Sequence, residues 1–275
     1  MSSPATTTQA PSVMRTVLFV PGSRPERFAK ALAAGADAVI IDLEDAVEQD
    51  QKAAARDNIR DFAAQAPDAR FLVRVNDATT SWFADDLALC ADLASVDAVV
   101  LPKAESAEQL AQVVRAGRKV LPIVESAQGV LALGELAAAP GVLRLSFGTL
   151  DFMLELGTTP DTPAAHMLLE HVRCQILMHS AARGLESPLD GVFPDFSNTE
   201  ALKNHTRHVR HLGFGGMLCI RPAQIAPIHQ AFAPSDAERD WARRVVEIAD
   251  RTGSSAFQVD GKMVDVPVIR RARQI

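Results

Sequence analysis

Short apolar runs alternate with longer amphipathic segments along most of the chain, and this alternation limits the possible folds more than any other feature. The apolar runs predict strands at Thr16–Val20, Ala38–Leu43, Phe71–Val75, Ala98–Leu101, Val120–Val124, Val142–Phe147, Pro188–Phe193 and Met217–Ile220. Helical periodicity predicts a helix after each strand, near Pro25–Ala34, Lys52–Ala64, Trp82–Asp92, Ala107–Ala116, Val130–Ala138, Ala164–Arg183, Glu200–His211 and Ala223–Phe232. A strand and a helix repeated eight times predict an α/β fold, a (β/α)8 TIM barrel of parallel strands. An open, doubly wound sheet is the structural alternative.

The two ends of the chain depart from this pattern. Residues 1–13 are rich in Ser, Thr, Ala and Pro and lack the apolar core of a signal peptide, so we expect a disordered tail. The barrel is expected over residues 14–233. Pro234-Ser235-Asp236 is a good helix start and Gly253 a good helix end. Residues 234–275 therefore predict a C-terminal helix followed by an extension.

The composition excludes several classes of protein. Of the 275 residues, 48% are hydrophobic and 23% charged, as is usual for a soluble globular protein, and the net charge of −6 does not suggest a nucleic-acid partner. No apolar run reaches the roughly 18 residues of a membrane helix. The three cysteines, Cys90, Cys174 and Cys219, are far apart and in no CxxC spacing. They indicate free thiols in a reducing compartment, so we expect a cytoplasmic protein without a membrane partner.

Ionisable residues directly follow most of the predicted strands. In a TIM barrel these positions meet at one pole, where the chemistry of such enzymes is built. The strand ends are Pro21-Gly22-Ser23-Arg24, Asp42-Leu43-Glu44-Asp45, Arg74-Val75-Asn76, Pro102-Lys103, Glu125-Ser126, Gly148-Thr149-Leu150-Asp151 and Arg221-Pro222. Any one of them is explained equally well as a solvated turn, but their repetition favours a functional pole.

Glu125 and Asp151 are the best candidates for metal ligands. They end successive strands, so their carboxylates can converge, and no His or Cys lies near them in the sequence. Carboxylates without nitrogen or sulfur ligands suit a hard cation, most naturally Mg²⁺, with Mn²⁺ as a substitute. Ordinary salt bridges are the alternative.

Two cationic features have both a structural and a functional interpretation. Arg74 lies inside an apolar strand and needs a partner, either Asp42 or Glu44 in an ion pair or a developing oxyanion. The helix start at Pro25 is flanked by Arg24, Arg27 and Lys30, which are candidate phosphate contacts. A capped surface helix with basic residues explains that segment equally well.

Six stretches stand in the order seen in citrate lyase β-subunit-like proteins, a group that includes malyl-CoA and citramalyl-CoA lyases of the HpcH/HpaI aldolase superfamily. They are Thr16–Gly22, Asp42–Val47, Arg74–Asn76, Leu101–Lys103, Pro122–Ser126 and Phe147–Phe152. Each motif is weak alone, but six in order at strand ends cover essentially the whole chain after the tail. The sequence therefore resembles this family.

The resemblance implies a Mg²⁺-dependent barrel enzyme, a homotrimer or hexamer, that cleaves or forms the bond between an acyl-CoA and a keto acid. It implies that Glu125 and Asp151 bind Mg²⁺ and that Arg74 stabilises the thioester enolate. It places the phosphates of the CoA ester near Arg24, Arg27 and Lys30, and we group Lys103 with these substrate contacts.

Asp42, Glu44 and Asp45 form a cluster that first suggests the metal site itself. Once Glu125 and Asp151 are assigned to Mg²⁺, the cluster is better explained as the support around the metal. Asp42 and Glu44 then face the pole and hold metal-bound waters or Arg74.

The C-terminal segment Gln258–Pro267 resembles the lid of the CoA-thioester lyases. The resemblance implies that the lid closes over a neighbouring subunit and that Asp260 transfers a proton. The sequence alone favours an Asp-Gly hairpin turn there, and both interpretations are compatible. One departure from many relatives is Arg221, which stands where they carry His before Pro222, and its role is open.

Two other functions remain possible from the sequence. A class II aldolase acting on free pyruvate would have a similar fold and metal pair, but it typically carries His where this chain has Asp45. The β subunit of a citrate lyase complex, acting on a citryl thioester held by an acyl-carrier protein, would not need the lid.

Overall fold

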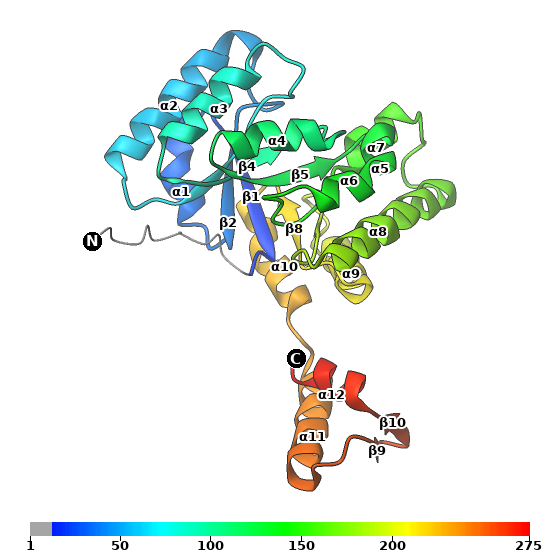
Figure 1. Cartoon of the computed structure of the whole chain (residues 1–275). Coiled ribbons are helices and arrows are strands. Elements are labelled where there is room, and N and C mark those ends of the chain that lie inside the picture. Colours follow the sequence, from blue (N-terminus) through cyan, green and yellow to red (C-terminus); the bar gives the residue numbers. More distant parts are fainter. Residues whose placement is uncertain (1–12) are drawn as a thin grey trace, which may run out of the picture. The chain divides into compact units, whose positions relative to one another are not determined.

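The computed structural model describes residues 13–275, so the predicted tail over residues 1–13 lies outside the described residues except for Val13. The chain divides into two compact units (Figure 1). The first extends to Gln230 and the second runs from Ala231 to Ile275. Each unit is described by itself below.

The first unit is a closed barrel of eight parallel strands in sequence order, which confirms the predicted fold. The strands are β1 (Thr16–Pro21), β2 (Ala38–Asp42), β3 (Phe71–Arg74), β4 (Val96–Leu101), β5 (Lys119–Val124), β6 (Ser146–Phe147), β7 (Leu189–Asp190) and β8 (Gly216–Cys219). Pairing of Thr16 in β1 with Met217 in β8 closes the sheet on itself. Because all strands run the same way, their carboxyl ends share one pole.

Helices surround the strands (Figure 1). They are η1 (Pro25–Arg27), α1 (Phe28–Leu32), η2 (Gln49–Gln51), α2 (Lys52–Gln65), α3 (Phe83–Asp92), α4 (Ala107–Arg115), α5 (Ala127–Leu131), α6 (Leu133–Ala138), α7 (Thr149–Glu155), α8 (Pro163–Arg183), α9 (Thr199–Leu212), η3 (Pro222–Gln224) and α10 (Ile225–Phe232). Inside the barrel, one apolar cluster fills the space between the strands, with Val17, Ile40, Leu72, Val100 and Leu121 among its members. A filled interior leaves the pole as the place for a site.

Several elements differ from the sequence prediction. The helix predicted over Pro25–Ala34 is a 3-10 turn followed by the five-residue α1, and the helix predicted over Val130–Ala138 is two short helices. The strand predicted over Val142–Phe147 is only β6, because Arg144 interrupts its apolar pattern and leaves Val142 as an isolated bridge to Val120. Helix α7 was not predicted, so Asp151 lies in the first turn of a helix rather than on a strand.

The C-terminal unit consists of α11 (Asp236–Thr252), an antiparallel hairpin of β9 (Phe257–Val259) and β10 (Lys262–Val264), and α12 (Val266–Ala272). Ser235 and Glu238 form a capping box at the start of α11, and Gly253 ends the helix in a left-handed conformation, as predicted. Val245, Val259 and Val264 belong to an apolar core within this unit. No helix within residues 13–275 is long and apolar enough to cross a membrane.

Candidate active site

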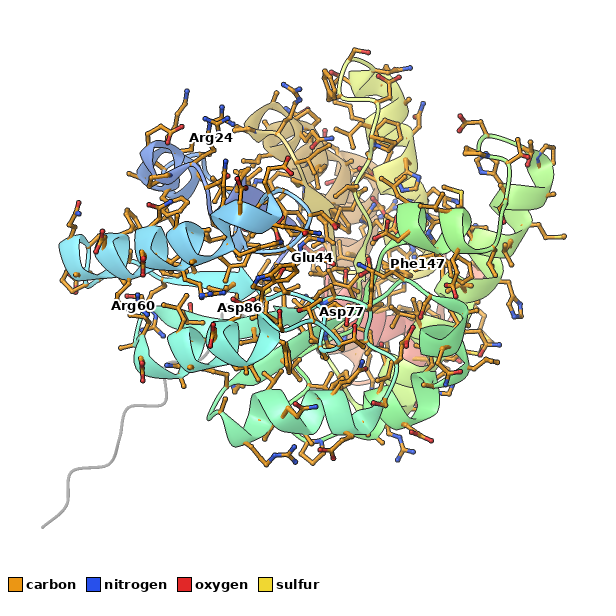
Figure 2. All side chains as sticks on the ribbon, turned by 90° about the horizontal axis from the view of Figure 1, so that it is seen from above. Arg24, Glu44, Arg60, Asp77, Asp86 and Phe147 are labelled. Atoms are coloured by element: carbon orange, nitrogen blue, oxygen red, sulfur yellow. The ribbon has the colours of Figure 1, made fainter. Side chains whose placement is uncertain are left out.

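A pocket of about 330 Å³ opens at the carboxyl ends of the barrel strands. Its wall contains Asp42, Arg74, Glu125 and Asp151, which sequence analysis assigned to four different strand ends. The rest of the wall is largely apolar and includes Phe19, Ile123, Phe147, Leu218 and Ile220. In Figure 2, Glu44 and Phe147 lie toward the middle of the barrel, whereas Arg24 lies at its periphery.

Arg74 is fixed by a two-pronged ion pair with Asp42. The Arg74 Nε and Nη2 atoms each donate a hydrogen bond of 2.7 Å to Asp42, whose carboxylate also accepts from the backbone of Glu44 and Ala46. The guanidinium carbon lies 4.9 Å from the centre of the Phe19 ring. Burial acts to lower the pKa of Arg74, but the charge and hydrogen bonds of Asp42 raise it overall, so the side chain stays cationic.

Glu44 joins two cations at the floor of the site. Its Oε2 lies 2.8 Å from Arg74 Nη1, and its Oε1 accepts a 2.7 Å hydrogen bond from Lys103 Nζ. Burial raises the pKa of Glu44, while the charges of Arg74 and Lys103 act to lower it. Asp45 is different, because its side chain is 60% exposed and only its Oδ2 reaches Arg74, at 3.4 Å.

Glu125 directly follows β5 and is only 5% exposed. Its Oε1 accepts a 2.8 Å hydrogen bond from the backbone N–H of Lys103, whose backbone adopts a left-handed conformation with φ of 45°. Burial raises the pKa of Glu125 to about 8, and the negative charges of Glu44 and Asp151 act in the same direction. A buried carboxylate beside other carboxylates favours either a proton or a cation.

Gly148 lets Asp151 and Glu125 share the pocket. A Cβ at position 148 would lie 2.2 Å from Glu125 Oε2, so only glycine allows this approach at the start of α7. Within residues 13–275, no group of three or more His, Cys, Asp or Glu side chains could hold a metal ion. Two carboxylates do not make a zinc site, but they fit Mg²⁺, which takes one or two carboxylates and fills its other positions with water or substrate oxygens.

Lys52 is a residue of this site that sequence reasoning missed. Its buried ammonium donates hydrogen bonds of 2.7 Å to the carbonyl oxygens of Leu43 and Glu44, and it lies 5.4 Å from the centre of the Trp82 ring. It thereby holds the loop that carries Asp42, Glu44 and Asp45. A lysine at the first position of a predicted helix gave no sign of this, because its partners are backbone atoms.

Asp190, at the end of β7, was also missed. It is buried and accepts hydrogen bonds from Arg173 Nε at 2.9 Å and from His205 Nε2 at 2.8 Å. The guanidinium carbon of Arg173 lies 5.8 Å from the centre of the Phe147 ring, and Phe147 is a residue just before α7. The strand was predicted over Pro188–Phe193, so Asp190 lay inside the predicted strand, whereas the observed β7 ends at Asp190.

The predicted CoA contacts of the barrel are not part of the pocket wall, and Asp260 belongs to the other unit. Arg24, Arg27 and Lys30 are exposed around η1 and α1, and Arg27 Nε is 3.8 Å from Glu26. Asp260 is in the C-terminal unit, at the tip of the β9–β10 hairpin with φ of 52°, as the Asp-Gly turn predicts. Its Oδ2 accepts a 2.7 Å hydrogen bond from Arg244 Nη2.

The sequence model of the HpcH/HpaI aldolase/citrate lyase family matches residues 15–222, which is the barrel with its strand-end motifs. The chain belongs to this family. HpcH/HpaI members similar to it include the citrate lyase subunit beta-like protein of Mycobacterium tuberculosis, which is 40% identical over 258 residues, 93% of this chain and 92% of that protein. A (3S)-malyl-CoA thioesterase of Cereibacter sphaeroides is 38% identical over 270 residues, 94% of this chain and 92% of that protein.

A solved HpcH/HpaI structure agrees with the fold over nearly the whole chain. It is the crystal structure of protein CitE from Mycobacterium tuberculosis in complex with magnesium, acetoacetate and coenzyme A. The two chains are 39% identical with a TM-score of 0.85, and the match covers 95% of this chain and 96% of the other. The family and the barrel are therefore established for this protein.

Proposed function

We propose that this protein is a Mg²⁺-dependent carbon–carbon lyase that cleaves or forms a 3-hydroxyacyl-CoA of the malyl-CoA or citramalyl-CoA type. Its substrates are an acyl-CoA and a small keto acid. The observation that carries the proposal is the pocket in which the carboxylates of Glu125 and Asp151 face a fixed arginine, Arg74. The ligands of the similar mycobacterial structure, magnesium, acetoacetate and coenzyme A, have the same chemistry.

Glu125 and Asp151 would hold Mg²⁺, or Mn²⁺ in its place. Bound there, the metal would supply positive charge to the carboxylate and the neighbouring oxygen of the substrate. Glu44 has an Oε2 atom that is buried without a hydrogen bond, although it pairs with Arg74. Asp42, Glu44 and Asp45 support this region and do not bind the metal directly.

Arg74 stabilises the negative oxygen that forms on the thioester when the carbon–carbon bond breaks. Asp42 and Asp45 accept from three of its five N–H groups and Glu44 Oε2 lies 2.8 Å from Nη1, so one N–H of Nη2 remains for a ligand. Because Asp42 already holds the side chain in place, little reorganisation is needed when charge develops. The largely apolar wall of the pocket strengthens the interaction by excluding water.

Asp260 then returns a proton to the carbon of the enolate, or removes it in the direction of condensation. We propose that it acts in the site of a neighbouring subunit of a homotrimer or hexamer, with the C-terminal unit as a lid. Arg24, Arg27 and Lys30 offer exposed positive charge to the phosphates of CoA. Lys103 orients Glu125 and Glu44, which makes it a support of the site more than a contact for CoA.

A coupled assay of the purified protein tests this proposal. Mg²⁺, acyl-CoA esters and C2 to C4 keto acids are combined, and malyl-CoA and citramalyl-CoA are tested for cleavage. Turnover of a CoA ester by the protein alone is the expected result. Activity only with an acyl-carrier protein would instead indicate a citrate lyase β subunit, and activity with free pyruvate and an aldehyde would indicate a class II aldolase. Release of free CoA without an acyl-CoA product would indicate that hydrolysis follows, as the names of the thioesterase relatives suggest.

A further inference from the structure

Arg221 is the chain neighbour of a residue that lines the pocket. It follows β8 immediately after Ile220, which lines the pocket and is 41% exposed. Sequence analysis singled out Arg221 as a departure from many relatives, and the proposed reaction leaves it without a role. Its surroundings suggest one.

The Arg221 side chain is held in place by an aromatic ring. Its guanidinium carbon lies 3.8 Å from the centre of the Phe196 ring, which belongs to the loop after β7 and is 53% exposed. Stacking of this kind restrains the guanidinium while its edge N–H groups stay available to a ligand.

The loop beneath Arg221 is also fixed. Gln224 is buried, and its Oε1 accepts hydrogen bonds from the backbone N–H groups of Ile220 at 3.0 Å and Arg221 at 3.1 Å. Its Nε2 donates a 2.9 Å hydrogen bond to the carbonyl oxygen of Phe193. One side chain thus ties the loop of Arg221 to the loop of Phe196, so the stacked pair is built on a rigid base.

Among the described residues the charge of Arg221 is uncompensated, in contrast to the charges of Arg74 and Lys103. Arg74 and Lys103 are paired with Asp42 and Glu44, but none of the carboxylates in residues 13–275 pairs with the guanidinium of Arg221. Ile220 and the partly exposed Leu150 add apolar surface to the pocket, and Phe196 adds apolar surface beside Arg221. A fixed, unpaired cation beside apolar groups suits a ligand that is itself amphipathic and anionic.

We propose that Arg221 is a specificity-determining residue that binds an anionic group of the substrate at the mouth of the pocket. The group is either a phosphate of the CoA moiety or the carboxylate of the keto acid, which share the same oxygen-anion chemistry. The inference rests on the proposed function, since it assigns Arg221 to the substrates of that reaction.

The test compares Arg221→Gln with Arg221→Lys and with the control Arg60→Gln. Arg60 is an exposed arginine on α2 that pairs with Asp57 and lies at the periphery of the barrel (Figure 2). Condensation is measured with acetyl-CoA and with S-acetyl-N-acetylcysteamine, which has the same thioester but no phosphates, using the keto acid that is active in the screen above. Binding of CoA alone is measured by calorimetry.

Loss of a charged hydrogen bond should cost about tenfold or more. If Arg221 binds a phosphate, Arg221→Gln raises KM for acetyl-CoA and weakens CoA binding but leaves the truncated thioester unaffected. If it binds the keto acid, the same variant raises KM for the keto acid with both thioesters. Arg221→Lys keeps the charge but lacks the planar stack. Its KM should therefore lie between those of the wild type and Arg221→Gln.

Unchanged KM values and CoA binding in Arg221→Gln, relative to Arg60→Gln, would overturn the inference. Thermal unfolding of each variant shows whether a loss reflects folding, and no large change is expected for an exposed side chain. Calorimetry with CoA also separates this inference about Arg221 from the proposed function. Absence of turnover in the wild-type protein would refute the proposed function, whereas Arg221-dependent binding of CoA would still stand.

Discussion

Glu125 is the side chain on which the candidate site depends most. It is buried, it accepts a hydrogen bond from the strained backbone of Lys103, and it lies beside two other carboxylates. Such a group is costly to bury as an anion unless a cation accompanies it. The cost of burying this charge and its offset by a bound cation or proton lead to two predictions.

Replacing Glu125 with Gln should weaken Mg²⁺ binding by about tenfold or more, because one of two charged ligands is lost. Titration calorimetry with Mg²⁺ measures the effect. Glu108→Gln is the matched control, since Glu108 is on the outer helix α4 and pairs only with Arg115. An unchanged titration in Glu125→Gln would remove this residue from the ligands of the metal.

The raised pKa of Glu125, about 8 against an ordinary 4.5, makes the stability of the metal-free protein depend on pH. Between these values the folded protein binds a proton that the unfolded chain does not. The stabilisation that this proton gives the folded protein is therefore fully present below about pH 4.5 and is lost as the pH rises through 8. Mg²⁺ takes the place of the proton, so its stabilising effect should grow over the same range.

Urea unfolding at pH 5, 7 and 9, with EDTA and with Mg²⁺, measures both effects. Glu125→Gln should reduce the difference between the pH values, because the titrating group is gone. Metal-free wild-type protein whose stability rises steadily from pH 5 to 9 would contradict the assignment.

Among the strands and helices, the regular ones could be predicted from sequence and the interrupted ones could not. Strands β1 to β5 are largely apolar runs, and Asp42, Arg74 and Glu125 at the ends of β2, β3 and β5 line the pocket. Strands β6 and β7 have two residues each, and their limits depend on pairing with neighbours that local periodicity does not contain. Helix α7 was hidden for a related reason, since it begins within a motif that resembles a strand end.

The candidate site shows the same division. Glu125, Asp151, Arg74 and Asp42 were all predicted because each lies at or near the end of an apolar run, and they line one pocket. Lys52 could not be found in that way, because it reaches the loop after β2 from α2. Its role depends on a contact between two elements in space, and local sequence patterns do not reveal that contact.

The junction of β6 and α7 gives a prediction of its own. A methyl group at Gly148 would collide with Glu125, lying 2.2 Å from Oε2 and 2.5 Å from Cβ, so Gly148→Ala should displace this ligand. We expect Mg²⁺ affinity to fall about tenfold or more and stability to fall by about 1 to 3 kcal/mol.

Calorimetry and urea unfolding of Gly148→Ala provide the two measurements. Gly134→Ala is the control, because the nearest atom to its new methyl group is 3.5 Å away in His179, and alanine is favoured over glycine in a helix. Equal behaviour of the two variants would show that Glu125 has room to move.

Across the whole chain, the two units have separate cores and carry different parts of the proposed chemistry. The barrel holds Arg74 and the metal ligands, and the C-terminal unit holds Asp260. If Asp260 serves a neighbouring subunit, a defect in one unit can be compensated by an intact copy from another chain.

Asp260→Asn alone should abolish turnover while binding of Mg²⁺ and of the CoA ester stays close to wild type. Arg74→Met should be inactive for a different reason. Mixing the two inactive proteins under conditions that allow subunits to exchange should restore part of the activity, because some sites then combine an intact Arg74 with an intact Asp260. Exchange is verified by mass spectrometry of labelled chains. Exchange without restored activity would place both residues in the same subunit or exclude Asp260 from the reaction.

The left-handed backbone at Lys103 has a consequence for engineering. A residue other than glycine costs about 1 to 2 kcal/mol in this conformation, so glycine is the substitution that a search for heat-resistant variants would favour there. It would also remove the ammonium group from Glu44. At Lys103, a directed-evolution campaign for heat resistance therefore sets the relief of backbone strain against the loss of a partner for a buried carboxylate, and activity has to be screened in every round.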